Sequence, residues 1–167
     1  PVDVTERVVQ ACSVTHTHPA AHAGAVTVAM LVHYAVRGRT DALTLAEKHA
    51  GLEDVALGNK IRDAVRLANE GISLESALSV IGNDVTVYQT VPLAFFLIYR
   101  IRDARSLLTV AAHVGGNTDT IALICGAYIG AVYGKTALPG DLLEGLECRS
   151  EIESMAARLY ERYTTKP

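Results

Sequence analysis

Two adjacent glycines, Gly115 and Gly116, lie between two apolar segments and constrain the fold more than any other feature. One apolar pattern with helical spacing ends at His113, and a second begins at Thr118. Because glycine adopts positive φ without steric cost, an adjacent pair lets the backbone turn sharply and approach a neighbouring group closely. The sequence therefore predicts a tight turn between two helices at this point.

The residues that follow the glycines, 117–120, carry four oxygen-bearing side chains in succession. Asn117 is a favoured N-cap residue, and Asp119 in the first turn would face the positive end of the helix dipole. Ordinary capping can explain both. Clustered amide, carboxylate and hydroxyl oxygens are also the ligands that Mg²⁺ prefers. On that interpretation Asp119 and Thr120 reach one ion, and Asn117 reaches the same ion or a second one.

The rest of the chain predicts helices throughout. Residues 85–88 have a strand-like composition, but no second strand is present to pair with them, and an isolated strand is not stable. We expect Pro92 to open a buried helix instead, and Gly51 to end a short one. The expected helices cover about 3–14, 19–37, 41–50, 53–69, 73–80, 92–99, 103–113 and 118–134.

A last helix is expected near the C-terminus. Ser150 and Glu153 have the spacing of a capping box at its start. Its apolar residues would dock it onto the rest of the protein; they are Ile152, Met155 and Leu159. Together these patterns predict an all-α protein and a single domain over residues 1–167.

Composition limits the class of partner. Half of the 167 residues are hydrophobic, which is enough to bury a core. The net charge is −3 with both signs scattered along the chain, so no basic stripe for nucleic acid is present. The longest apolar run, 121–133, is shorter than the ~20 residues of a membrane helix. Three cysteines without paired spacing indicate reduced thiols and a cytoplasmic protein. We expect neither nucleic acid nor a membrane as partner.

Three histidines, His16, His18 and His22, follow the first expected helix. No cysteine or fourth ligand accompanies them, which makes a zinc site a poor match. Histidines in such places commonly satisfy buried polar groups or cap a helix. A binding role remains open beside these two interpretations.

Several segments together resemble one family. Residues 115–120 resemble the C-terminal Gly-Gly-Asp-Thr-Asp-Thr signature of the ADP-ribosylglycohydrolase family, which a helix of small residues follows. Residues 13–19 resemble its Thr-His-x-His-Pro stretch, and residues 90–94 its Thr-x-Pro-x-Ala helix start. Residues 138–146 fit it as well. These segments occur in the family's order between about residues 4 and 160.

The resemblance implies a compact multi-helix orthogonal bundle, truncated here at its N-terminus. It implies hydrolysis of the bond between ADP-ribose and a modified side chain, or of a related ADP-ribose conjugate, with two Mg²⁺ or Mn²⁺ ions. Asp119 would be the catalytic residue. The implied metal ligands are Asn117, Asp119 and Thr120, and the implied substrate-binding residues are His16, Gly115 and Gly116.

Two departures from the family pattern matter for function. Asn117 stands where the family has aspartate, which removes one negative charge from the site. The family's Thr-Asp-Asp ligands, acidic flap and Gly-Asn-Gly loop would lie before Pro1. We therefore expect this chain to supply half of a dinuclear site, to need an N-terminal half as partner and to be inactive alone. The alternative is a non-catalytic module of the same fold that binds ADP-ribose or a nucleotide, or that serves structurally.

Overall fold

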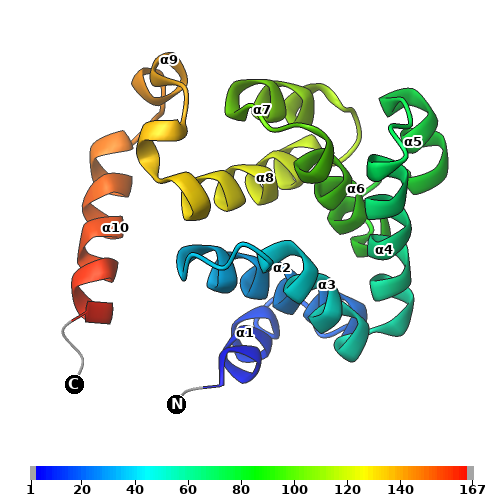
Figure 1. The fold of residues 1–167 in the computed structure, drawn as a ribbon. Helices are drawn as coiled ribbons and strands as arrows, with labels where there is room; N and C mark the ends of the chain where they lie inside the picture. Colours follow the sequence, from blue (N-terminus) through cyan, green and yellow to red (C-terminus); the bar gives the residue numbers. More distant parts are fainter. Residues whose placement is uncertain (1–2, 165–167) are drawn as a thin grey trace.

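The computed structural model describes residues 3–164, and Figure 1 shows that they form helices joined by short turns. These residues contain no strand, so the all-α prediction is confirmed. The helices are α1 (Val4–Cys12), α2 (Pro19–Val36), α3 (Ala42–Glu53), α4 (Val55–Asn69), α5 (Leu74–Ile81), α6 (Val87–Arg100), α7 (Ala104–His113), α8 (Thr118–Tyr133), the 3-10 helix η1 (Lys135–Ala137), α9 (Gly140–Glu144) and α10 (Arg149–Thr164).

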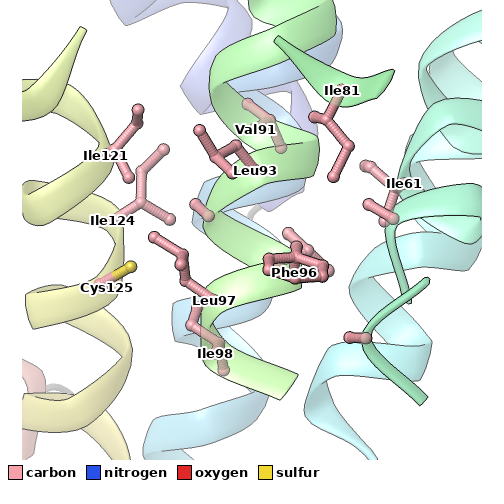
Figure 2. Packing of buried hydrophobic residues seen from close by; sticks show 14 of the residues in the cluster. Ile61, Ile81, Val91, Leu93, Phe96, Leu97, Ile98, Ile121, Ile124 and Cys125 are labelled. Atoms are coloured by element: carbon pink, nitrogen blue, oxygen red, sulfur yellow. The ribbon is translucent and has the colours of Figure 1, made fainter. Parts of the chain in front are cut away.

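Helix α6 is the centre of the core. Every residue from 90 to 98 is buried, so this helix is apolar on all sides and packed on all sides. Figure 2 shows Leu93 and Leu97 on the side of α6 that faces α8, and Phe96 on the side that faces α4. Neighbouring helices therefore hold α6 in a fixed place.

The expected start of α6 at Pro92 is wrong, because the helix begins five residues earlier at Val87. Two side chains hold the preceding turn: the Asp84 amide donates to Gln89 Oε1 at 2.8 Å, and the Thr90 hydroxyl donates to the Asp84 carbonyl at 2.9 Å. Pro92 lies inside the helix, where it lacks the N–H that would bond to the Tyr88 carbonyl. Its ring is buried in the core.

The expected end of α3 at Gly51 is also wrong, since the helix continues to Glu53. A Cβ on Gly58 of α4 would come within 2.5 Å of the Gly51 Cα, so the two glycines allow close contact between the helices. The helix ends at Asp54, whose backbone is extended and whose carboxylate accepts from the Leu57 amide at 2.9 Å. Gly51 therefore allows α3 and α4 to pack closely and does not end α3.

The capping box predicted for the last helix is wrong. Helix α10 already begins at Arg149, so Ser150 lies inside it. The Ser150 hydroxyl donates to the Glu151 carboxylate at 2.8 Å, and Glu153 accepts from Arg149 Nε, also at 2.8 Å. Neither side chain of the expected pair reaches the backbone of the helix start.

Docking of α10 through its apolar face is wrong as well. In Figure 1, α10 points away from the group of helices formed by α2 through α8. Its apolar side chains are exposed rather than packed; they are Ile152, Met155 and Leu159. This face has the spacing of a buried helix face without a surface to cover it.

Helix α2 is the one helix in the described part of the chain whose length and composition would allow it to cross a membrane. Core helices of proteins without any membrane span meet the same criterion, and 44% of α2 is buried inside the protein. The longest apolar run of the sequence, residues 121–133, lies instead in the shorter helix α8.

Candidate functional site

The loop between α7 and α8 has the predicted tight turn. Gly115 and Gly116 have φ of +80° and +62°, in the region that L side chains rarely adopt. A Cβ on Gly116 would in addition overlap the carbonyl of Asn83. The second glycine is therefore required twice, by its own conformation and by the close approach of another segment.

Asn83, in the turn between α5 and α6, fixes this loop. Its carbonyl accepts from the Asn117 amide at 2.8 Å, and its side-chain amide donates to the Val114 carbonyl at 3.1 Å. Residues 82–84, Gly-Asn-Asp, have only the sequence signature of a turn. No local signal could have shown the contact, because Asn83 and Asn117 are far apart in the chain.

Asn117 is the N-cap residue of α8, as predicted, but its side chain makes no capping hydrogen bond. Its amide nitrogen donates to the Thr90 hydroxyl of α6 at 2.9 Å, and its Oδ1 accepts from the Thr120 hydroxyl at 3.1 Å. Capping thus does not account for this side chain. Asn117 instead links the start of α8 to the core helix and keeps its oxygen beside Thr120.

Three side-chain oxygens gather at the start of α8. Thr120 Oγ1 lies 3.1 Å from Asn117 Oδ1 and 3.4 Å from Asp119 Oδ1. Neighbouring oxygens around an octahedral Mg²⁺ are about 2.9 Å apart, since each lies about 2.0–2.1 Å from the ion. Asp119 Oδ1 is further held by the Thr120 amide at 2.7 Å. The donor types and their spacing therefore fit one side of a site for a hard cation.

The charge of this cluster is low for a complete metal site. Asp119 supplies its one carboxylate, and the other two oxygens are neutral. Among residues 3–164, no group of three or more His, Cys, Asp or Glu side chains is placed to hold a metal ion. That result includes the three histidines, so it gives the zinc interpretation no support.

Two members of the oxygen cluster, Asn117 and Thr120, line a large apolar groove. The groove has a volume of about 1070 Å³, and residues of α2, α6 and α8 form most of its walls. Of the predicted site residues, His16, Asn117 and Thr120 line it. Gly115, Gly116 and Asp119 do not, although Gly116 is next to Asn117 and Asp119 is next to Thr120 in the chain. The structure thus brings the two predicted groups, the histidine stretch and the loop, to one groove.

Hydrogen bonds define the role of two histidines. His18 is the N-cap residue of α2 and accepts from the Ala20 amide at 3.2 Å, as the capping interpretation predicts. His22 Nε2 lies 2.8 Å from the His16 carbonyl, so this nitrogen must carry the hydrogen. Ser13 Oγ, 3.1 Å away, is then an acceptor, and His22 cannot act as its base. This pair is not an activated serine.

His16 differs from the other two. Its side chain is exposed at the edge of the groove, and its Nδ1 lies 2.8 Å from the Thr15 hydroxyl. That contact fixes one ring nitrogen and hence the orientation of the imidazole. His16 therefore lines the groove with its ring held in one orientation.

Tyr88 and Asp54 form a pair that the sequence analysis did not predict. Tyr88 lines the groove and donates its hydroxyl to Asp54 Oδ2 at 2.7 Å. The Leu57 amide first, and this hydroxyl second, hold the pKa of Asp54 below its usual value, and the same bond raises the pKa of Tyr88. A carboxylate before a helix is the only local signal of Asp54, and it indicates no more than a cap.

The fold and this loop define a class: an all-α protein with an oxygen-rich helix start beside an apolar groove. The family model described as ADP-ribosylglycohydrolase matches residues 1–167, so this chain belongs to the ADP-ribosylglycohydrolase family. The resemblance seen in the sequence is confirmed.

Relatives with curated names extend this result. An uncharacterized protein of Archaeoglobus fulgidus is 37% identical over 89% of this chain and 48% of its own length. The ADP-ribosylhydrolase ARH3 of Gallus gallus is 25% identical over 96% of this chain and 52% of its own length. The uncharacterized protein YegU of Escherichia coli is 27% identical over 93% and 49%, respectively. The chain spans about half the length of these relatives.

Proposed function

We propose that this chain supplies half of the active site of a metal-dependent hydrolase. The enzyme would remove ADP-ribose from a modified protein side chain or from a small ADP-ribose conjugate. The cluster of Asn117, Asp119 and Thr120 oxygens beside the groove carries the proposal, because its spacing suits a hard cation. Family membership and relatives named as ADP-ribosylhydrolases support it.

Asn117, Asp119 and Thr120 are the residues that would hold Mg²⁺ or Mn²⁺, with two ions in the complete site. Such ions can orient a water and stabilise the charge that develops as a glycosidic bond breaks. Asp119 is the proposed catalytic residue, since its carboxylate is the one charge in the cluster and the Thr120 amide fixes it at 2.7 Å. His16 would contact the ribose, and the positive φ of Gly115 and Gly116 would let the backbone approach the substrate.

The half-site explains why we expect no turnover by this chain alone. Hard cations gain affinity from the number of charged ligands, and this loop offers a single carboxylate. The neutral Asn117 side chain, tied to Thr90 at 2.9 Å, cannot replace a second one. The remaining carboxylates would come from the partner half. We place the reaction in the cytoplasm, in keeping with three cysteines that are all free.

The second candidate is a non-catalytic module that binds ADP-ribose or a nucleotide through the same groove. One observation favours it: no group of three His, Cys, Asp or Glu side chains that could hold a metal ion occurs in the described residues. On this account ADP-ribose binds without metal, and substitution of Asp119 leaves its affinity unchanged.

Calorimetric titration of the chain with Mn²⁺ tests the metal role. We expect Asp119→Ala to lower the affinity by roughly tenfold or more, because it removes the charged ligand. Glu75→Ala is the matched control, since Glu75 is also an acidic residue in a first helical turn but lies in α5, outside the oxygen cluster. Equal Mn²⁺ affinity for Asp119→Ala and the parent would show that Asp119 only stabilises the helix start, and would favour the second candidate.

A further inference from the structure

Two polar residues among those that the structure describes are buried, Thr27 and Thr90. Both are threonines inside helices, where such a hydroxyl commonly donates to the carbonyl four residues earlier. Thr27 of α2 does so, because its hydroxyl donates to the Ala23 carbonyl at 2.7 Å. The Thr90 hydroxyl of α6 instead donates to the Asp84 carbonyl at 2.9 Å, in the turn before the helix. Thr90 therefore bonds outside its own helix.

The Thr90 hydroxyl has a single hydrogen, and the Asp84 carbonyl, which can only accept, takes it. The oxygen of Thr90 therefore faces Asn117 with lone pairs alone. The atom of Asn117 that lies 2.9 Å from this oxygen must be a donor, and only the amide nitrogen of that side chain can donate. The hydrogen bonds thus decide which end of the Asn117 amide faces Thr90, although the two ends have nearly the same shape.

The opposite end of the Asn117 amide, Oδ1, consequently lies in the oxygen cluster. It accepts from the Thr120 hydroxyl at 3.1 Å, and the same hydroxyl lies 3.4 Å from Asp119 Oδ1. If the amide were turned over, its NH₂ group would take the place of Oδ1 and put hydrogens there. A side-chain amide coordinates a hard cation through its oxygen, so only one of the two orientations supplies a ligand.

We infer that Thr90 is a positioning residue: together with the Asp84 carbonyl it fixes the orientation of the Asn117 amide and presents Asn117 Oδ1 to the cluster. Thr90 is only 3% exposed and lies in the core helix, so packing of α6 sets its place independently of the loop. The orientation of the amide follows from hydrogen bonds alone. Its consequence for metal affinity rests on the proposed function.

The same arrangement bears on the charge of the site. A carboxylate at position 117 has no hydrogen to donate, so its oxygen would lie against the lone pairs of the Thr90 hydroxyl. Thr90 could donate to that carboxylate only by giving up its bond to the Asp84 carbonyl. The network therefore suits the neutral amide that this chain has at position 117.

Hydrogen exchange of side-chain amides, measured by NMR on the metal-free chain, tests the orientation. The NH₂ group of Asn117 should exchange more slowly than that of Asn69, which is exposed at the end of α4. This comparison needs no substitution. Thr90→Val keeps the shape of the buried side chain but removes the acceptor, so the slow exchange should be lost. Thr90→Ser retains the hydroxyl and should retain the slow exchange.

Calorimetric titration with Mn²⁺ supplies the second readout. Groups that orient a metal ligand typically contribute about tenfold or more in affinity, so Thr90→Val should lower Mn²⁺ affinity by that factor. Thr90→Ser should bind like the parent. Thr27→Val is the matched control, because it removes the other buried threonine hydroxyl, which donates within α2. It should change neither the Asn117 exchange nor the affinity, and circular dichroism should show the same helix content in all variants.

Three results would overturn the inference. The first is an Asn117 NH₂ group that exchanges as fast as that of Asn69 in the parent. The second is slow exchange that persists in Thr90→Val. The third is an Mn²⁺ affinity that Asp119→Ala lowers but Thr90→Val leaves unchanged.

One combination separates this inference from the proposed function. If the Asn117 exchange depends on Thr90 as expected while Asp119→Ala binds Mn²⁺ like the parent, the orientation of the amide is confirmed. The proposed metal role of the cluster would then be wrong.

Discussion

At the scale of single residues, Gly116 is the most constrained position in the loop. Its φ of +62° disfavours any L side chain, and a Cβ would overlap the Asn83 carbonyl. Gly38 has a similar φ of +70°, but a Cβ there would meet nothing within 4 Å. Substitutions at these two glycines therefore separate the free-energy cost of the left-handed conformation from the cost of the contact with Asn83.

Gly116→Ala should therefore destabilise the protein more than Gly38→Ala. We expect roughly 1–2 kcal/mol for Gly38→Ala from the left-handed conformation alone. Gly116→Ala should cost at least about 1 kcal/mol more, because Asn83 must also move. Urea denaturation measures both free energies of unfolding. Equal losses would show that Asn83 does not constrain the loop.

The bond between Tyr88 and Asp54 predicts a pH dependence of stability. The pKa of Asp54 is lowered in the folded protein, by the Leu57 amide and then by the Tyr88 hydroxyl. A lowered folded pKa contributes stability that is present above the unfolded pKa of about 3.9 and is lost as the pH falls through the folded value.

Tyr88→Phe should hence destabilise the protein at neutral pH and lose less stability than the parent on acidification below about pH 4. Thermal unfolding between pH 2 and pH 7 measures this difference. Tyr133→Phe is the control, because Tyr133 is exposed and has no hydrogen bond to Asp54. If the unfolding temperatures of Tyr88→Phe and the parent changed in parallel with pH, the bond between Tyr88 and Asp54 would not be the cause of the pH dependence.

Asn117 permits a test of charge in the oxygen cluster. Asn117→Asp adds a carboxylate where the family pattern has one, so Mn²⁺ affinity should rise by roughly tenfold. Without metal the variant should be slightly less stable, for two reasons. Its new charge lies close to Asp119, and the hydrogen bond that the Asn117 side-chain amide donates to the Thr90 hydroxyl is lost. Calorimetry and thermal unfolding measure the two effects. An unchanged affinity would place the metal elsewhere.

At the scale of elements, the helices follow from local patterns but some of their ends do not. Helix propensity and apolar spacing predicted the helices around the core, and Pro19 and Asn117 fall at helix starts as expected. Gly51 and Pro92 have the signature of helix boundaries, yet both lie inside helices. Contacts with other segments decide these two positions: Gly58 packs on Gly51, and the core surrounds Pro92.

The central position of α6 predicts a large difference between two leucines. Leu97 of α6 is buried in the core, whereas Leu123 of α8 is exposed in the groove. Leu97→Ala should cost about 2–5 kcal/mol, and Leu123→Ala less than about 0.5 kcal/mol in this chain alone. Chemical denaturation measures both. A large loss for Leu123→Ala would mean that the groove is closed in solution.

At the scale of the whole molecule, the all-α class could be predicted because nothing in the chain offers a second strand. The contact of the loop with Asn83 and Thr90 could not, since each lies far away in sequence. The exposed face of α10 could not be predicted either. Apolar spacing shows that a helix has a face to bury, but it does not show whether this chain supplies the surface that covers it.

The most direct test of the account measures release of ADP-ribose from arginine- and serine-linked ADP-ribosylated peptides in the presence of Mg²⁺. The samples are this chain alone, and this chain combined with the unmatched part of the Archaeoglobus fulgidus protein. We expect no turnover by the chain alone, and turnover by the combined halves that Asp119→Ala abolishes and Glu75→Ala preserves. Turnover by the chain alone, or by the combined halves regardless of Asp119, would contradict it.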